Sequence, residues 1–547
     1  MKILRFFLGV TRKDRIRNEY IRGTAHVRGF GDQVREARLR WFGHVQRRDS
    51  EYIGRRMLSF ELPGRRPRGR PKRRFMDVVK EDMKVVGVRK RMQKTGLDGG
   101  NSPWRPLKWK AERRRRSMHV FISTSVSSVL MSVSSQAEVG APGVVVGVSV
   151  DGAPVWCEGI GYADLENRVP CSPQTMFRIA SISKPLTTAA AARLCEEGKL
   201  DLDASVQKYV PEFPQKQFDG QNVTITPRMI MSHLSGIRHY EKDACKVKES
   251  MEKAKRLLKV PVREDDKAQA ATEKNPKDKE SVQPQKDEDF ASVEFYLKDK
   301  FESVTEALDL FKDDPLIFRP GTTYLYSTHA FTLLSAVMER AAGRSFLDLM
   351  MNMFHELGMV NTVPEENDPI IYHRSRNYHF NKKGRVVNCP YVDNSYKWAG
   401  GGYLSTVGDL LLFGNALLYS YQVKDTDGVL PGFLKPQTAI DLWTPSDKTG
   451  ELWVRDGLYA QGWVVVEKGQ KFGQCRKRRH YVSHTGAAVG ASSVLLLLPS
   501  EEMNERKGQT FTAPQGVVVT ILTNMESVGL SSTALKIANE FDKARSL

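Results

Sequence analysis

Apolar runs rich in β-branched residues stand at both ends of the region that follows residue 138, and this arrangement constrains the fold most. The run Gly143–Val150 ends in Asp151-Gly152, a hairpin turn signal, and Val155–Tyr162 reads as the returning strand. The corresponding elements near the C-terminus are the strands Val494–Leu498 and Gly516–Leu522 and the amphipathic helix Ser531–Ala544. Strands at both ends, with helical patterns between them, predict one α/β (α+β) domain over residues 138–547 that is closed by its own termini.

The positive charge of the chain lies outside this predicted domain. The formal net charge is +20, but residues 1–117 contain about 35 Lys and Arg against about 12 Asp and Glu, so the remainder carries about −3. We therefore expect a basic, mostly disordered or helical tail, and no nucleic acid bound to the domain over residues 138–547. Within the tail, Arg68-Gly69-Arg70-Pro71 resembles an AT-hook; a solvated basic linker is the alternative.

The stretch Lys13–Val88 carries a resemblance of its own. KDRIRNEYIRGTAHV, REARLRWFGHVQRRD and GRPKRRFMDVVKEDM are similar to the C-terminal tail of a LINE-type reverse transcriptase, whose catalytic part is absent. We assign the stretch no polymerase function and interpret it as a fragment joined to an unrelated domain by a genomic fusion or a gene-model error.

One segment inside the predicted domain has little to bury. Residues 241–294 are dominated by Lys, Glu, Asp, Gln and Pro, which predicts a disordered charged insertion. Elsewhere, no apolar run reaches the roughly 18 residues of a membrane span, so no transmembrane segment is expected. The six cysteines show no metal-ligand spacing, and we expect neither a metal nor a cofactor.

The strongest chemical signal is Ser181-Ile182-Ser183-Lys184-Pro185, directly before the helical run Leu186–Gly198. Residues three apart share one face of a helix, so the hydroxyl of Ser181 and the amine of Lys184 are expected to point the same way. A serine needs an adjacent base to act as a nucleophile, and a buried lysine can lose its proton and become that base. The four-residue pattern alone is common by chance.

Two further elements follow in order. Tyr326 stands just before the helical run Phe331–Ala342, where a phenol near the Ser–Lys pair can transfer a proton to a leaving group. The sequence His484-Thr485-Gly486-Ala487 opens an apolar strand; Gly486 allows a substrate backbone to approach, and the following N–H can complete an oxyanion hole. The structural alternatives are that Tyr326 only packs against the start of a helix and that Gly486 is an ordinary glycine of an edge strand.

Together, these three elements resemble the motifs of the serine β-lactamases, penicillin-binding proteins and related esterases. Further segments are similar to the mitochondrial subgroup of this family in animals: EVGAPGVVVGVSVDG, GYADLENRVP, SHLSGIRHYEKD, YVDNSYKWAGGGYLSTVGDLL, SHTGAAVGASSVLLLLP and NMESVGLSSTALKIANEFDK. The resemblance covers Glu138 to Leu547. It implies a β-lactamase/transpeptidase-like fold, in which an antiparallel sheet closed by N- and C-terminal elements lies beside a helical region.

The resemblance also implies roles for individual residues. Ser181 would be the nucleophile, Lys184 the base and Tyr326 the proton-transferring tyrosine, while His484 would replace the lysine of the third motif. The N–H groups of Ser181 and Ala487 would form the oxyanion hole, and the substrate-binding residues would be Thr328, Thr485 and Gly486. Since Thr328 stands where β-lactamases carry an asparagine, efficient β-lactam hydrolysis is not expected.

The function that we predict is a serine-dependent acyl hydrolase, a peptidase that acts on a peptide or acyl substrate through an acyl-enzyme. The resemblance implies a mitochondrial location, a role in lipid metabolism and assembly into homo-oligomers or filaments. Three alternatives stay open: an esterase on the same scaffold, a catalytically weak filament-forming structural protein, and a nucleic-acid-binding protein that acts through the basic tail.

Overall fold

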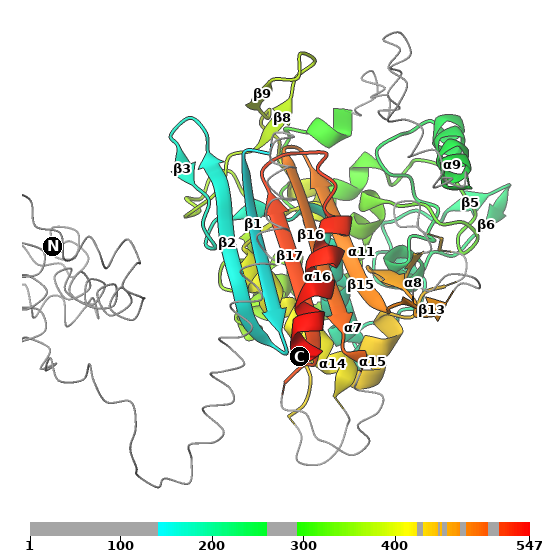
Figure 1. Ribbon diagram of the computed structural model, residues 1–547. Coiled ribbons are helices and arrows are strands. Elements are labelled where there is room, and N and C mark those ends of the chain that lie inside the picture. The colour runs from blue at the N-terminus through cyan, green and yellow to red at the C-terminus, as the bar shows by residue number, and fades with distance from the viewer. Residues whose placement is uncertain are drawn as a thin grey trace, which may run out of the picture. The chain divides into compact units, whose positions relative to one another are not determined.

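The computed structural model describes residues 141–259, 293–423, 430–446, 449–450, 457–470, 477–501 and 513–546. The tail predicted over residues 1–117, with its AT-hook-like and reverse-transcriptase-like stretches, lies outside the described residues. Within the described residues, the chain forms one large sheet with helices on both faces (Figure 1).

The large sheet has eight strands, and every neighbouring pair in it is antiparallel. In spatial order the strands are β11 (Leu458–Tyr459), β12 (Val464–Val466), β15 (Tyr481–Ala488), β16 (Ala491–Pro499), β17 (Gly516–Thr523), β1 (Gly143–Val150), β2 (Ala153–Asp164) and β3 (Val169–Pro170). β1 lies between β17 and β2, so strands from the two ends of the domain pair side by side. The prediction of a domain closed by its own termini is confirmed.

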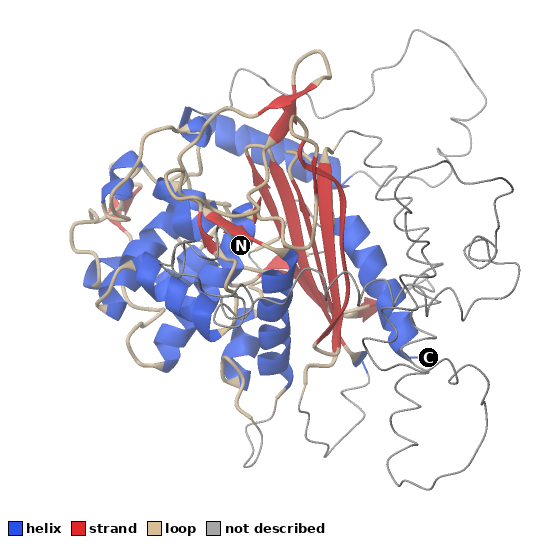
Figure 2. Ribbon diagram, turned by 90° about the vertical axis from the view of Figure 1, so that its left-hand side faces the viewer, coloured by secondary structure: helices blue, strands red, loops and turns tan. Residues whose placement is uncertain are grey.

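Alternate residues of the central strands face two different layers of helices. Val144, Val146 and Val148 of β1 pack toward α16 (Ser531–Ser546), which contributes Ile537 and Phe541 to a buried cluster. On the opposite face, α14 (Val407–Gln422) lies so close to β1 that a Cβ on Gly147 would come within 2.9 Å of Val407. Both faces are therefore covered, which explains why β1, β16 and β17 are buried along their whole length and consist mainly of apolar residues (Figure 2).

The helices on the α14 side form the second half of the domain (Figure 2). They are α7 (Ser183–Glu196), α8 (Pro227–Met231), α9 (Ala244–Lys259), α11 (Thr328–Ala342), α12 (Phe346–Glu356), α13 (Trp398–Gly401) and α15 (Pro436–Leu442). Short 3₁₀ turns are η3 (Ala180–Ile182), η4 (Val206–Lys208), η5 (Val293–Tyr296), η6 (Glu306–Leu310) and η7 (Ser395–Lys397). Small sheets are β4 (Phe177–Arg178) with β10 (Tyr403–Ser405) and β7 (Val363–Pro364), β5 (Gln217–Phe218) with β6 (Gln221–Asn222), β8 (Tyr378–Phe380) with β9 (Val386–Asn388), and β13 (Gly469–Gln470) with β14 (Lys477–Arg478).

The prediction of disorder over residues 241–294 is wrong at both ends of the segment, where the structure has helical turns. Its beginning contains α9, in which Ala244, Val247, Met251 and Ala254 are half-buried at helical spacing. Asp243 precedes the helix, and its carboxylate accepts hydrogen bonds from the N–H groups of Cys245 and Lys246. A composition rich in Lys and Glu is compatible with a solvated helix, which the composition-based prediction overlooked. Residues 260–292 lie outside the described residues.

The other end of the predicted insertion is also ordered, because Glu294 is buried. Its carboxylate accepts two hydrogen bonds from the Arg238 guanidinium, at 2.8 and 3.0 Å, and its Oε2 lies 2.8 Å from His329 Nε2. Burial raises the pKa of Glu294, but the hydrogen bonds from His329 and Arg238 outweigh it and hold the pKa at about 2. The ion pair thus fastens the two borders of the segment, Arg238 and Glu294, to each other and to α11.

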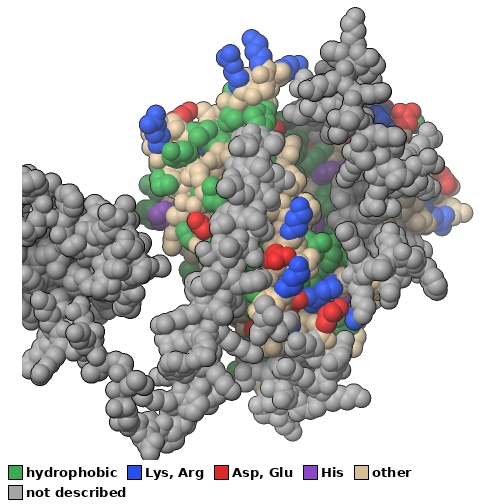
Figure 3. All heavy atoms as spheres, viewed as in Figure 1, with side chains coloured by type: hydrophobic (Ala, Val, Ile, Leu, Met, Phe, Trp, Pro, Cys, Tyr) green, Lys and Arg blue, Asp and Glu red, His purple; other side chains and the backbone are tan. Residues whose placement is uncertain are grey.

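Lys and Arg alternate with Asp and Glu on the face of the domain that carries α16 (Figure 3). Arg479 pairs with Asp542, and Lys543 pairs with Glu540 on α16 itself. Among the described residues, no helix has both the length and the apolar character that a membrane crossing requires. The mixed charge of this face matches the near-neutral charge that the sequence assigns to the domain.

Candidate active site

The Ser181 hydroxyl lies at the junction of a 3₁₀ turn and a helix. η3 carries Ser181, and α7 begins two residues later at Ser183, three residues earlier than the predicted helical run. Ala180 has a left-handed backbone with φ of +49°, an unfavourable conformation for a residue with a Cβ, directly before the serine. This geometry places Lys184 Nζ 3.2 Å from Ser181 Oγ, so the predicted pair is in contact.

Lys184 is completely buried, and oxygen atoms and aromatic rings surround its amine. Nζ donates a hydrogen bond of 2.7 Å to the carbonyl of Gly400, lies 3.3 Å from Thr328 Oγ1, and lies 4.6 Å from the centre of the Tyr326 ring. Among the described residues, no carboxylate forms an ion pair with it. Burial, together with the nearby charge of Lys397, holds the pKa of Lys184 well below its ordinary value. Its uncharged amine is therefore favoured, as a base requires.

Thr328 and Tyr326 flank this amine from the start of α11. Thr328 is the first residue of the helix; it is buried, and its hydroxyl contacts Lys184. The half-buried Tyr326 ring lies over the Lys184 amine and 4.3 Å from the ring of His233. The structure thus brings both predicted residues to the base. The contact of Thr328 with Lys184 points to orienting the base, whereas its substrate-binding role stays a prediction.

His484 lies in the middle of β15, which begins at Tyr481 and not at His484 as the sequence predicted. Its Nδ1 lies 2.6 Å from the carbonyl of Thr485, which can only accept, so Nδ1 carries the proton. Nε2 therefore accepts the hydrogen bond from the hydroxyl of Tyr459, at 2.9 Å. Burial, followed by the charge of Lys184, lowers the pKa of His484 to about 3. The third motif consequently presents a neutral imidazole.

Gly486 is needed for packing inside the protein, whether or not a substrate approaches it. A Cβ on Gly486 would lie 2.4 Å from the carbonyl oxygen of Ile179 and 2.2 Å from Ser493 Oγ, so glycine lets β15 pack against the segment that carries Ser181. The side chains of Thr485 and Ala487 are exposed on the other face of β15. Since β12 pairs only with Tyr481–Ser483, the part of β15 from residue 484 onward has a free edge within the described residues, where backbone N–H groups can meet a ligand.

Several residues at the site were missed or misread from the sequence. Tyr459 bonds to His484 across a separation of 25 residues, and no local pattern marks it. His239 Nδ1 accepts the N–H of Thr328, at 3.3 Å, and its ring stacks on Tyr240. His233 is buried as well; its ring packs against Tyr326, and its Nδ1 accepts the N–H of Ser327 at 3.2 Å.

The triple glycine 400–402 brings its backbone close to the base, where the Gly400 carbonyl accepts from Lys184. A Cβ on Gly400 would lie 2.7 Å from Thr328 Cγ2, so a larger residue would push the Gly400 carbonyl away from Lys184. Similarly, Thr226 and Thr406 cap α8 and α14 with hydrogen bonds from the N–H groups of Met229 and Asp409.

Comparison with known proteins identifies the family of this chain. A family model described as beta-lactamase matches residues 133–536. The proteins named "Serine beta-lactamase-like protein LACTB, mitochondrial" of Homo sapiens and Mus musculus are 57% and 56% identical to this chain, over 75% of it and 78% of each relative. This chain belongs to the beta-lactamase family. The resemblance expected from the sequence is thereby confirmed.

Solved structures of this family share the fold at low sequence identity. A hydrolase named EstCE1, described as having promiscuous acyltransferase activity, aligns with a TM-score of 0.54 and 21% identity over 77% of this chain and 99% of its own. The octameric penicillin-binding protein homologue from Pyrococcus abyssi aligns with a TM-score of 0.52 and 21% identity over 75% of this chain and 76% of its own. Both alignments confirm the predicted fold class.

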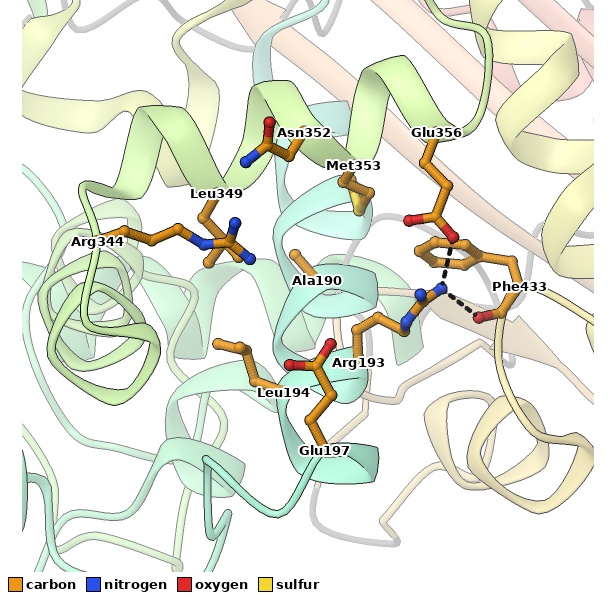
Figure 4. A pocket seen from close by; sticks show the side chains of 10 residues that line it. All are labelled: Ala190, Arg193, Leu194, Glu197, Arg344, Leu349, Asn352, Met353, Glu356 and Phe433. Atoms are coloured by element: carbon orange, nitrogen blue, oxygen red, sulfur yellow. Dashed lines mark hydrogen bonds and ion pairs between the residues drawn. The ribbon is translucent and has the colours of Figure 1, made fainter.

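A small pocket lies away from the Ser181–Lys184 pair, at the other end of α7, where α7 faces α12 (Figure 4). Arg193 spans it, donating hydrogen bonds of 3.0 Å to Glu356 and to the carbonyl of Phe433. Because Arg193 and Glu356 already pair with each other, we interpret the pocket as a packing gap between α7 and α12. Among the described residues, no group of three His, Cys, Asp or Glu side chains is placed to hold a metal ion.

The buried histidines of this beta-lactamase-family protein make its stability pH-dependent. The pKa of His233 lies well below its ordinary value and that of His484 is about 3, mainly because of burial. In the unfolded chain, a histidine binds a proton below a pH of about 6.5, whereas in the folded chain these buried histidines stay neutral at that pH. The stability that is present above this pH is therefore lost as the pH falls toward 3. We expect a loss of about 1.4 kcal/mol per pH unit for each such histidine.

Thermal melts between pH 7.5 and pH 4.5 measure this effect. The melting temperature of the intact protein should change little above about pH 6.5 and should fall below it, less steeply in His484→Gln. The matched control is His355→Gln, because His355 is exposed on α12. Equal slopes in all three proteins would contradict the assignment.

Proposed function

We propose that this protein is a serine-dependent acyl hydrolase in which Ser181 is the nucleophile and Lys184 its base. The contact of 3.2 Å between Ser181 Oγ and Lys184 Nζ carries the proposal, because the amine is buried with no carboxylate partner among the described residues. An uncharged amine at this distance can accept the hydroxyl proton as the serine attacks an acyl carbon.

The surrounding groups support a two-step reaction through an acyl-enzyme. Ser181 Oγ would bond to the carbonyl carbon while its proton moves to Lys184. The N–H groups of Ser181 and Ala487 would stabilise the oxyanion, since the edge of β15 is free beyond Ser483. Collapse of the tetrahedral intermediate would expel the leaving group, which takes a proton from Lys184. Tyr326, whose ring centre lies 4.6 Å from Lys184 Nζ, would be the residue that relays this proton. Water would then release the acyl group by the same steps in reverse order.

The substrate class that we propose is a peptide, with a simple ester as the alternative. Thr328 replaces an asparagine amide and contacts Lys184 through its hydroxyl, so it leaves one fewer side-chain amide for binding a substrate amide. Efficient cleavage of β-lactams is therefore not expected.

Location and assembly follow the relatives. The human and mouse proteins are named mitochondrial, and we propose the same location and a family-type role in lipid metabolism for this chain. The penicillin-binding protein homologue from Pyrococcus abyssi is described as octameric, and we propose that this chain also forms homo-oligomers or filaments.

A substrate panel tests the proposal. The protein is incubated with p-nitrophenyl butyrate, with peptide p-nitroanilides and with a chromogenic cephalosporin, and the acylated residue is located by mass spectrometry after a fluorophosphonate treatment. We expect an adduct on Ser181, cleavage of the ester and of at least one anilide, and no efficient cephalosporin turnover. Ester cleavage alone would favour the esterase. Filaments without any adduct would favour the structural protein, and salt-sensitive DNA retention by residues 1–117 would favour binding through the tail.

A further inference from the structure

A second lysine, Lys397, is buried beside the site without an anionic partner. Its side chain is 4% exposed, and among the described residues it forms no ion pair with a carboxylate. Three aromatic rings face its amine instead, with centres at 4.9 Å for Tyr396, 5.4 Å for Phe295 and 5.8 Å for Tyr240. Ring faces attract a cation, so this box favours a charged ammonium at a defined position.

The backbone that follows Lys397 in sequence contacts the base, Lys184. Lys397 ends η7, and α13 follows directly with the carbonyl of Gly400, which accepts the hydrogen bond of 2.7 Å from Lys184. The carbonyl of Ala399 accepts a second bond, of 2.9 Å, from Thr187 on α7. The short segment that begins at Lys397 is therefore bonded to α7 at both Lys184 and Thr187.

Within the part of the chain that the structure describes, the other titratable groups around Lys184 come from four neighbouring segments and include no carboxylate. They are His233 after α8, His239 in the following loop, Tyr326 before α11 and His484 on β15. Burial favours the neutral form of each of the three histidines, with His484 also held by Tyr459. Lys397 is thus the lysine near Lys184 in the described residues that aromatic rings surround.

We propose that Lys397 is a positioning residue for the hydrolytic reaction, whose ammonium acts through space on Lys184 and favours the uncharged amine that takes the proton of Ser181. The proposal rests on the function proposed above for Ser181 and Lys184. Two ammonium groups in a poorly hydrated site repel each other, so a cation that aromatic rings hold in place opposes a second positive charge on Lys184. The motif at His484 carries no positive charge, because its imidazole is neutral. Lys397, directly before α13, supplies a positive charge in its place.

The pH dependence of hydrolysis tests this role. kcat/KM for the neutral ester p-nitrophenyl butyrate is measured from pH 5.5 to pH 10 with the full chain, Lys397→Met and Lys397→Arg. Without the second cation, Lys184 keeps its proton to higher pH, so the acid limb of Lys397→Met should move to higher pH. We expect a loss of about tenfold at the acid end and activity within about twofold on the alkaline plateau. Lys397→Arg should restore the original profile.

The matched control is Lys216→Met, which removes another buried lysine. Lys216 donates to the backbone carbonyls of Lys312 and Asp314 and is not a neighbour that influences Lys184, so its removal should leave the pH profile in place. A loss in Lys397→Met that is equal at every pH, or an unchanged profile, overturns the proposal. So does failure of Lys397→Met and Lys397→Gln to fold while Lys397→Arg folds, because the ammonium is then structural. No Ser181-dependent hydrolysis in the unaltered chain overturns the proposed function instead.

Discussion

Ser181→Ala is expected to abolish fluorophosphonate labelling and to lower turnover by about 10⁴-fold or more, because the covalent route disappears with the hydroxyl. The neighbouring hydroxyl of Ser183 cannot replace it. Ser183 is completely buried, and its Oγ donates a hydrogen bond of 2.7 Å to the carbonyl of Ala180. A residual rate well above the uncatalysed one is still expected, since the oxyanion donors are backbone groups that the substitution leaves in place.

The fold should survive this substitution. Ser181 is half-buried at the mouth of the site, so removing its Oγ leaves no enclosed cavity and the melting temperature should change little. The control is Ser335→Ala, which removes a buried hydroxyl that bonds to the carbonyl of Thr332 inside α11, away from the nucleophile. Labelling and turnover are measured on both variants and on the unaltered chain. Labelling of Ser181→Ala at the original level would show that another residue is the nucleophile.

Lys184→Arg is expected to be nearly as damaging as Lys184→Met, with both variants losing about 10²- to 10⁴-fold in kcat/KM. A guanidinium stays protonated at every relevant pH and cannot accept the serine proton. It must also fit a site in which the amine already lies 2.7 Å from the carbonyl of Gly400 and 3.3 Å from Thr328 Oγ1. The positive charge is retained in the arginine variant, so the comparison separates a base from a simple cation.

The measurement for this pair is kcat/KM over pH, together with the rate of fluorophosphonate labelling. In the unaltered chain, burial and Lys397 hold the pKa of Lys184 well below its ordinary value, so activity should rise as the pH increases through that lowered pKa and should be present near neutrality. Both variants should lose this rise. If Lys184→Arg keeps most of the activity at neutral pH, Lys184 contributes only a charge and the proposed proton transfer is wrong.

Elements with a strong local pattern were predictable from the sequence. β1 occupies Gly143–Val150 as predicted, and the turn that follows it uses positive φ at Asp151 and Gly152, the conformation that its hairpin signal requires. The pair Ser181 and Lys184 was also predictable, because a spacing of three residues places two side chains together in any helical turn. In contrast, composition misjudged α9, where a helical stripe of small and apolar residues lies among the charges.

The sequence alone determined which residue types carry the chemistry and which segments become strands and helices, because hydrophobic period and local spacing depend only on neighbours along the chain. The tertiary structure decided the environment of the base. The carbonyl of Gly400 lies 216 residues from Lys184 in sequence, and Tyr459, Lys397 and His239 reach the site from three other elements. Burial, charge repulsion and the choice of histidine tautomer arise from these long-range contacts. They determine whether the lysine is a base or a cation, and no local pattern encodes them.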